Sequence, residues 1–293
     1  MDSCTLKSES LVAVIHAKGA ELHSLKTADG KELIWQADAT YWGRHAPHLF
    51  PIVGRLTNDT LKHKGESYTM TQHGFARDML FEIEQATDAE CTFLLCDNKS
   101  TLEKYPFHFE FRVHFSLTEN ILSITYQVTN TGDELLPCSV GAHPAFNWPL
   151  PGNDNRDNHH IEFTETETCD INRLDAGLVK NDTFPWPWAT ENNGFELNDR
   201  LFEPDAMIFT EHYSREVTYS GEQGPSITVK FDDFPHLGIW SVPGAGFVCI
   251  EPWQGHSSAV DFDGDFSDKP GLVKIEANEQ QRWTMDIVIE NNL

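Results

Sequence analysis

A strict alternation of apolar and polar residues between positions 107 and 117 constrains the fold of this chain more than any other feature. The segment reads FHFEFRVHFSL, with an apolar residue at every odd position and a polar one at every even position. Successive side chains of a β-strand point to opposite faces, so this period of two predicts a strand with one buried face. The residues LTEN and a second alternating run, ILSITYQVTNTG, follow directly. Together the two runs predict a β-hairpin.

The rest of the chain repeats this pattern in shorter pieces. We predict further strands at Leu11–Ile15, Ser226–Phe231, Gly238–Ser241, Phe247–Glu251 and Thr284–Ile289. No stretch of a dozen residues combines a helical apolar stripe with caps. Many short strands separated by turn residues predict an all-β fold, a large antiparallel β-sandwich. No linker divides the chain, so we expect one domain over residues 1–293, with surface loops at Asn153–Asn158 and Phe184–Trp188.

Charge argues against nucleic acid and anionic membranes as partners. The chain has 21 basic and 46 acidic residues, a formal net charge of −25 with histidine neutral, and no basic stripe. Nucleic-acid affinity rests largely on neutralising phosphates with Lys and Arg, so this field repels such partners. The negative field neither attracts nor repels a neutral sugar, whereas a phosphorylated sugar needs a local basic pocket.

The sequence also indicates a cellular compartment. Its first residues, MDSCTLKSES, lack the apolar core of a signal peptide, and no run approaches the roughly 18 apolar residues of a membrane span. None of the six cysteines has CxxC spacing, which favours free thiols in a reducing compartment over disulfides or a zinc site. We therefore expect a cytoplasmic protein. The cysteines are Cys4, Cys91, Cys96, Cys138, Cys169 and Cys249.

Four segments concentrate polar residues between aromatic residues, prolines and glycines. They are residues 42–56 (WGRHAPHLFPIVGRL), 72–78 (QHGFARD), 139–150 (SVGAHPAFNWPL) and 239–253 (IWSVPGAGFVCIEPW). A single histidine such as His143 is more often structural than catalytic, and a loop arginine usually bonds to its own fold. Glu251 ends the apolar run FVCI, and a buried carboxylate needs partners or a raised pKa. Four tryptophans of these segments fit either a core or a sugar pocket: Trp42, Trp148, Trp240 and Trp253.

Six segments, taken in order, resemble one known family. They are GAELHSLK (19–26), ELIWQ (32–36), WGRHAPHLFPIVGRL (42–56), HGFARD (73–78), GAHPAFNWPL (141–150) and FVCIEPW (247–253). Each segment alone is a weak signal. In this order, and over nearly the whole chain, they resemble the aldose 1-epimerase family, in particular its LacX-like branch. The resemblance implies the galactose mutarotase-like sandwich, an isomerase activity on carbohydrates, and no cofactor or metal.

The resemblance also implies a mechanism. Mutarotation interconverts α and β anomers by opening the hemiacetal, for which the C1 hydroxyl loses a proton while the ring oxygen gains one. The family's glutamate that takes the anomeric proton matches Glu251 in CIEPW, and the histidine that protonates the ring oxygen matches His143 in GAHPAFN. A carboxylate in an apolar surround and an imidazole titrating near neutrality suit this exchange.

Four further residues are implied as substrate contacts. His73 in HGF matches a substrate-contacting histidine, and Arg55 matches the arginine that binds sugar hydroxyls after FPxxGR. Asp205 in EPDAMIF is a weaker match to a substrate-binding aspartate. Arg77 belongs to the HGFAR form, shared with relatives that act on hexose phosphates, so the substrate is an aldose or an aldose phosphate. Arg44, Arg55 and Arg77 could form a phosphate clamp, although salt bridges explain two of the three equally well.

Several alternatives stay open. A non-catalytic sugar-binding or sensor protein would keep the same fold and pocket, and a hexose-6-phosphate 1-epimerase would keep the same chemistry. A metal-dependent cupin is suggested by 14 histidines but lacks the HxH-plus-glutamate spacing. A glycosidase would need a second buried acid beside Glu251. No GxSxG, GxGxxG or GxxxxGK[ST] motif indicates nucleophilic hydrolysis or nucleotide binding, and oligomeric state is not readable from one chain.

Overall fold

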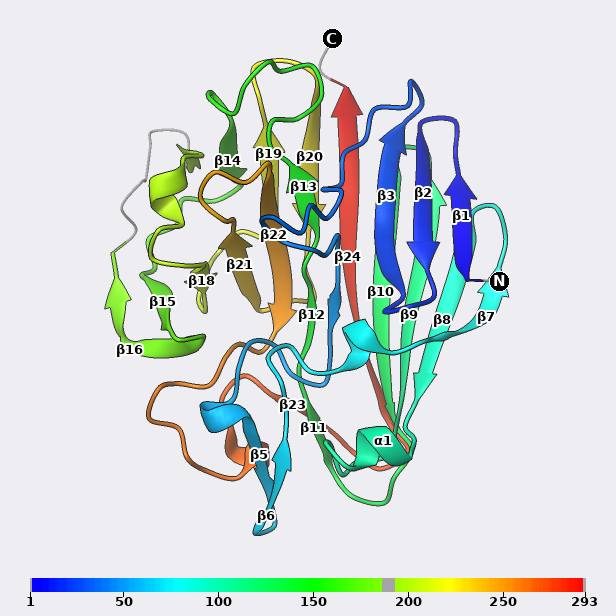
Figure 1. The fold of residues 1–293 in the computed structure, drawn as a ribbon, viewed down its shortest axis with the longest axis vertical. Coiled ribbons are helices and arrows are strands. Elements are labelled where there is room, and N and C mark those ends of the chain that lie inside the picture. The colour runs from blue at the N-terminus through cyan, green and yellow to red at the C-terminus, as the bar shows by residue number, and fades with distance from the viewer. Residues whose placement is uncertain (1, 186–192, 292–293) are drawn as a thin grey trace.

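The computed structural model describes residues 2–185 and 193–291, and two large antiparallel sheets dominate it (Figure 1). The nine-stranded sheet has the order β17-β14-β19-β20-β24-β10-β9-β8-β7. Its strands in chain order are β7 (Glu82–Ala86), β8 (Glu90–Cys96), β9 (Phe109–Thr118), β10 (Ile121–Asn130), β14 (His160–Phe163), β17 (Gly194–Glu196), β19 (Glu216–Ser220), β20 (Pro225–Lys230) and β24 (Gln280–Asn291).

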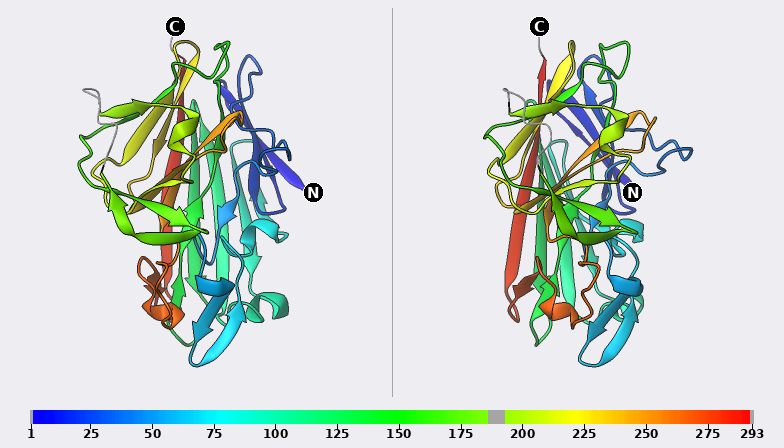
Figure 2. Two further views of the ribbon diagram at one scale, coloured as in Figure 1. Left: turned by 60° about the vertical axis from the view of Figure 1, so that its left-hand side comes forward. Right: turned by 90° about the vertical axis from the view of Figure 1, so that its left-hand side faces the viewer.

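The eight-stranded sheet has the order β16-β15-β18-β21-β22-β12-β4, with β13 also paired to β22. Its strands are β4 (His48–Leu49), β12 (Val140–Ala142), β13 (Ala145–Asn147), β15 (Ile171–Asp175), β16 (Leu178–Phe184), β18 (Met207–Phe209), β21 (His236–Trp240) and β22 (Phe247–Gln254). Figure 2 shows it turned against the long nine-stranded sheet. The predicted all-β sandwich is therefore confirmed.

Smaller elements complete the fold. A three-stranded sheet of β1 (Ser3–Lys7), β2 (Leu11–His16) and β3 (Glu21–Thr27) lies in front of β8–β10 in Figure 1. Two more pairs join β5 (Thr60–His63) with β6 (Glu66–Thr69), and β11 (Leu136–Cys138) with β23 (Val273–Ile275). The helical segments are α1 (Lys99–Leu102) and the short 3-10 turns η1 (Thr57–Asp59), η2 (Ala76–Asp78), η3 (Asp199–Leu201) and η4 (Phe266–Asp268).

The predicted hairpin is β9 and β10, with Thr118 opposite Ile121. The odd-numbered side chains of β9, from Phe109 to Leu117, are at most 3% exposed. The buried face therefore packs as the alternation predicts. One cluster of buried apolar side chains reaches from Cys4 in β1 to Ile289 in β24.

Five other predicted strands are present with shifted ends: β2, β20, β21, β22 and β24. The largest shift is in β24, which begins at Gln280 rather than Thr284 and ends at Asn291 rather than Ile289, and β22 continues beyond Glu251 through Pro252 to Gln254. Residues 153–158 form a loop as predicted. The loop predicted at Phe184–Trp188 is wrong at its first residue, because Phe184 still pairs with Ile171 as the end of β16. Its last three positions, 186–188, lie outside the described residues.

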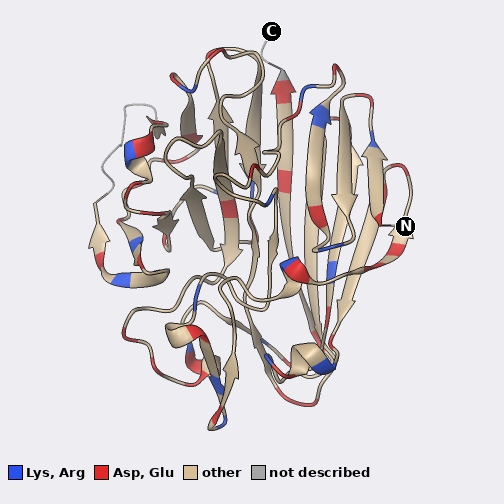
Figure 3. Cartoon of the chain, in the orientation of Figure 1, with Lys and Arg blue, Asp and Glu red and all other residues tan. Residues whose placement is uncertain are grey.

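The charged residues and the cysteines are distributed in the structure as the sequence analysis describes. Figure 3 shows Asp and Glu spread over both sheets, with Lys and Arg scattered among them. All six cysteines are free, four of them buried. Among the described residues, none of the helices is long and apolar enough to cross a membrane.

Candidate active site

The site is built where β12 and β13 meet β22. Gly141 in β12 lies opposite Trp253 of β22, and Ala145 in β13 lies opposite Cys249. Both pairs keep the same register, which places the intervening His143 opposite Glu251. Pro144 interrupts the ladder at this point, so β12 and β13 are separate strands. Residues more than a hundred positions apart thus become cross-strand neighbours.

The two side chains meet at the bottom of a cavity. His143 Nε2 lies 3.2 Å from Glu251 Oε2, and the two side chains are 8% and 2% exposed. The cavity has a volume of about 300 Å³, the lower end of the roughly 300–1,000 Å³ that small-molecule pockets span. Its walls include Trp42, Trp240 and Trp253.

Aromatic rings fix the imidazole of His143. The Trp42 ring stacks on it at 4.8 Å with an angle of 22° between the planes. Trp240 and His73 each meet the same ring edge-on, with 5.6 Å between ring centroids. Trp42 is itself held by its backbone carbonyl, which accepts a hydrogen bond from Trp35 Nε1 at 2.9 Å. The imidazole therefore sits in a rigid aromatic box.

Two glycines make room for the third tryptophan. A Cβ atom on Gly141 would lie 2.7 Å from the Trp253 ring, and one on Gly238 would lie 2.4 Å from it. Both distances are well inside van der Waals contact, so only glycine lets the indole lie across the strands beside Glu251.

Burial sets the electrostatics of the pair. It raises the pKa of Glu251 well above its usual value, and Asp205 adds to the rise. The Trp253 indole N–H opposes this shift, although it does not reach hydrogen-bonding geometry. Burial also lowers the pKa of His143 to about 3, with Arg77 adding to the fall. The raised pKa of Glu251 and the lowered pKa of His143 favour a state in which the pair shares one proton over 3.2 Å.

The cavity gathers polar atoms that lack partners. Nine buried side-chain nitrogen and oxygen atoms of the described residues have no hydrogen-bond partner, and four of them belong to residues that line this cavity. They are Arg77 Nε, His143 Nδ1, Trp253 Nε1 and Glu251 Oε2, the last of which faces His143 Nε2 at 3.2 Å without hydrogen-bonding geometry. Buried polar groups are nearly always paired in native proteins. Their concentration here indicates a place for a ligand rich in hydroxyl groups.

The structure brings five of the six predicted residues to this cavity: His73, Arg77, His143, Asp205 and Glu251. His73 Nδ1 accepts a hydrogen bond from the backbone N–H of Gly54 at 3.1 Å, so its Nε2 carries the proton of the neutral ring. Asp205 sits at the rim with a φ of 72°, a left-handed conformation that non-glycine residues adopt mainly at special sites.

Arg55 is the exception. Its Nε and Nη2 donate to the two carboxylate oxygens of Asp59 at 2.6 and 2.7 Å, and its Nη1 donates to the Ala176 carbonyl. It is not among the residues that line the cavity. Arg44 likewise pairs with Asp78 at 2.9 Å. Salt bridges therefore account for two of the three arginines.

Arg77 differs from both. Among the described residues no carboxylate lies within ion-pair distance of it, and its Nη2 donates to the Gln72 carbonyl at 2.6 Å. Burial and Arg44 lower its pKa to about 10, so it remains cationic at neutral pH. The cavity thus contains one positive charge that has no described carboxylate at ion-pair distance, although Asp78 and Glu21 act on it from further away.

The motifs did not single out every lining residue. Gln72, Leu174, Ala206, Ile208 and Ser257 also line the cavity, and only long-range folding brings these segments together. Trp148 was considered for a sugar pocket, but it lies in the core at 1% exposure, with its Nε1 bonded to the Arg156 carbonyl.

Among the described residues, two groups of side chains could hold a metal ion. His143, Cys249 and Glu251 form one, and Glu21, His23 and His45 form the other. The first coincides with the proton-sharing pair, which already defines an acid–base site within a polar and aromatic cavity.

The fold and this site define a β-sandwich with a candidate acid–base cavity, and comparison with known proteins gives its family. A sequence model of the aldose 1-epimerase family matches residues 2–270. The chain belongs to the aldose 1-epimerase family. The LacX proteins of Lactococcus lactis subsp. lactis, plasmid and chromosomal, are 34% identical over 98% of this chain and 99% of their own.

Solved structures of galactose mutarotase-related proteins have the same fold. A galactose mutarotase related enzyme from Lactobacillus acidophilus is 35% identical, with a TM-score of 0.92 over 99% of this chain and 97% of its own. A galactose mutarotase-like protein from Lactobacillus casei is 31% identical, with a TM-score of 0.91 over 98% of this chain and 100% of its own.

Proposed function

We propose that this chain is an aldose 1-epimerase that interconverts the α and β anomers of a hexose, with Glu251 as base and His143 as acid. The observation that carries the proposal is the His143–Glu251 contact of 3.2 Å at the bottom of a sugar-sized cavity. The free cysteines fit action in the cytoplasm. The substrate is a small aldose or aldose phosphate.

The mechanism uses the one proton that the pair shares. When the C1 hydroxyl of the sugar donates a hydrogen bond to Glu251, it stabilises the carboxylate, so the proton rests on His143. His143 then protonates the ring oxygen as Glu251 takes the C1 hydroxyl proton, and the bond between C1 and the ring oxygen breaks. After rotation about C1–C2, both transfers reverse on the other face of the aldehyde.

The surrounding residues hold the open chain. His73, Gln72 and Asp205 offer donors and acceptors to the hydroxyl groups, and the tryptophans offer apolar faces to the carbon skeleton. The direct test is polarimetry of freshly dissolved α-glucose and α-galactose with and without the protein. We expect equilibration to be faster than in buffer. Sugar binding without acceleration would instead identify a sugar sensor.

The pH dependence is a sharper test. The pair must hold one proton, and His143 gains a second only below its pKa of about 3. We therefore expect kcat/KM to stay level from pH 7.5 to 5.5, with an alkaline fall once Glu251 loses its proton above its raised pKa. Polarimetry in matched buffers, with circular dichroism at each pH, measures this. A loss of activity centred near pH 6.5 on acidification would contradict it.

Arg77 favours an anionic form of the substrate, a hexose phosphate, as a second candidate. A buried guanidinium without a carboxylate partner is satisfied by a phosphate, with which it makes charge-assisted hydrogen bonds. We expect Arg77→Met to lower kcat/KM on glucose 6-phosphate about 10- to 100-fold, the equivalent of one to two such bonds, with little effect on glucose.

The matched control for this test is Arg112→Met, because Arg112 lies on β9 and pairs with Glu84 and Glu110 away from the cavity. It should leave both substrates unaffected. Equal losses of activity on glucose and glucose 6-phosphate in Arg77→Met would assign Arg77 a structural role instead.

A further inference from the structure

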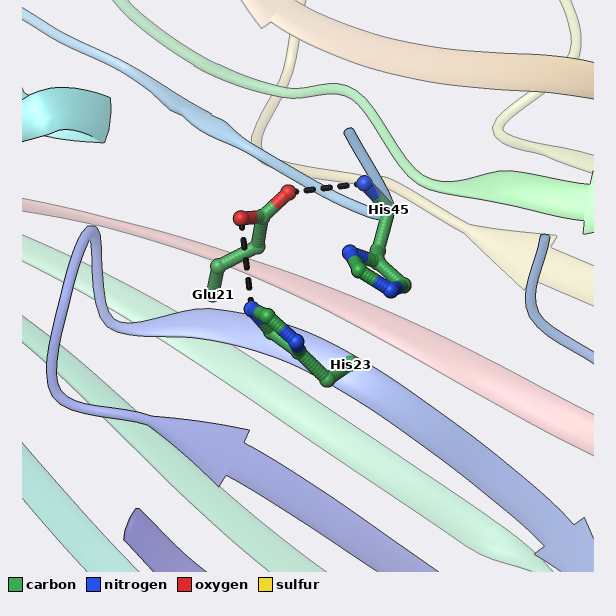
Figure 4. Close-up of side chains that lie close together, drawn as sticks. All are labelled: Glu21, His23 and His45. Carbon is green, nitrogen blue, oxygen red and sulfur yellow. Dashed lines mark hydrogen bonds and ion pairs between the residues drawn. The ribbon is translucent and has the colours of Figure 1, made fainter. Parts of the chain in front are cut away.

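Three histidines and one buried carboxylate gather on the β2–β3 hairpin, outside the residues that line the cavity. His16 at the end of β2 lies opposite Glu21 at the start of β3. His23 follows Glu21 by two residues along the strand, on the same face. Figure 4 shows the side chain of His45, which precedes β4, close to those of Glu21 and His23.

The side chains are closely packed. Glu21 Oε2 lies 3.5 Å from His23 Nε2. The rings of His16 and His23 stack at 3.8 Å with 2° between their planes, and those of His23 and His45 stack at 4.0 Å with 26°. One ligand atom from each of Glu21, His23 and His45 can be chosen so that all three lie within 4.8 Å of one another.

Glu21 carries a negative charge that no described Lys or Arg neutralises at ion-pair distance. The residue is 8% exposed. Its Oε1 accepts hydrogen bonds from the backbone N–H groups of His45 and Ala46, at 2.9 and 3.0 Å. These bonds and His23 outweigh burial and lower the pKa of Glu21 to about 2, so it is an anion at neutral pH. Glu21 Oε2 is thus an anionic oxygen donor beside the ring of His23.

Two of the neighbouring imidazoles, His16 and His45, have lowered pKa values. Burial lowers the pKa of both His16 and His45, and repulsion from His23 lowers each further, while Glu21 opposes the shift only in part. Arg77, on the cavity side, is drawn to the same carboxylate, but its Nη2 bonds to the Gln72 carbonyl. A neutral imidazole is the form that binds a metal.

We propose that Glu21, His23 and His45 bind one divalent first-row transition-metal ion, with Zn²⁺ the best match to two imidazoles and a carboxylate. The 3.5 Å between Glu21 Oε2 and His23 Nε2 is close to the roughly 3.3 Å between ligands about 2.0–2.1 Å from a tetrahedral ion. Water completes the coordination.

Binding requires one local movement. Stacked rings direct their lone pairs nearly parallel, so the ring of His45 must turn out of the stack toward the ion. Among the described residues no hydrogen bond holds its ring nitrogens, and its backbone N–H stays anchored on Glu21 Oε1. The ring of His23 keeps its plane because His16 is stacked behind it.

The ion would fasten the loop of residues 37–47 to the hairpin. The loop also carries Trp42, which stacks on His143, so the ion would brace one wall of the cavity without touching a substrate. The metal site does not rest on the proposed function, because its residues and its binding measurement are separate from the catalytic pair.

The test is a titration of the chelator-treated full chain with Co²⁺, followed by visible absorption, and with Zn²⁺ by calorimetry. We expect one ion per chain. His23→Ala and His45→Ala should each weaken binding at least about 100-fold, since loss even of an outer partner costs 10- to 100-fold. Glu21→Gln should do the same while keeping an oxygen for the backbone N–H groups of residues 45 and 46.

Controls separate this site from others. His108→Ala, which removes an exposed histidine paired with Asp97, should leave binding unchanged. Glu251→Gln and Cys96→Ser test the cavity and the exposed thiol. Zn²⁺ should also raise the Tm of the unaltered chain but not that of Glu21→Gln. Absence of binding at millimolar metal, or binding lost only in Glu251→Gln or Cys96→Ser, would overturn the proposal.

Discussion

Replacement of Glu251 by glutamine is expected to slow mutarotation about 10²- to 10⁴-fold, the usual worth of one positioned proton-transfer group. Glutamine has the same shape but cannot accept the C1 hydroxyl proton. The loss should fall on kcat, with KM little changed, because the amide can still hydrogen-bond the sugar in the ground state. Polarimetric initial rates over a range of sugar concentrations measure both constants.

This variant is also expected to remain as stable as the original chain, or to become more stable. Glu251 is 1% exposed and its Oε2 has no hydrogen-bond partner, so a neutral amide removes a buried ionisable group that is costly to the fold. Thermal unfolding checks this, and Glu66→Gln on the exposed strand β6 is the matched control. A folded Glu251→Gln protein with near-normal rates would remove the assignment of the base.

Replacement of His143 by asparagine should lower kcat by a similar factor of about 10²–10⁴. Asparagine retains a polar side chain opposite Glu251 but has no group that protonates the ring oxygen. The stacked contact with Trp42 is lost as well, so a modest fall in Tm is expected beside the catalytic loss. Rates and thermal unfolding are to be measured on the same preparation.

His108→Asn is the matched control for this variant. His108 is exposed, lies immediately before β9 and is not among the residues that line the cavity. It should keep full activity. The two catalytic variants combined should lose little more than either alone, because the residues act as one proton-sharing unit. Additive losses would mean that the two residues act independently.

Five of the six residues predicted from the family resemblance line one cavity, but the resemblance did not show how the surroundings of each residue change its charge. Arg55 and Arg77 both come from motifs of the resemblance, yet Arg55 is neutralised by Asp59 and Arg77 has no carboxylate at ion-pair distance among the described residues. Which guanidinium stays free depends on the carboxylates that the folded chain brings near it. Motif spacing does not contain that information.

The proposed metal ligands at the β2–β3 hairpin were likewise not predictable from residue spacing. The sequence spacing of histidines argued against a metal site, because no HxH-plus-glutamate pattern is present. Strand pairing places His16 opposite Glu21, and a separate loop supplies His45. A signal existed in the spacing Glu21-x-His23, which puts both side chains on one face of a strand, but it is too short to stand out.

The sequence by itself determined the fold class, because the period-two alternation of β9 and β10 is a local property of a strand with one buried face. Through their motifs it also predicted His143 and Glu251 as the acid and the base. Only the tertiary structure decided that they touch, since the common register of β12 and β13 along β22 brings His143 opposite Glu251. Burial and nearby charge act through space, so the pKa values and the unpartnered Arg77 follow from the assembled cavity and not from the order of the residues.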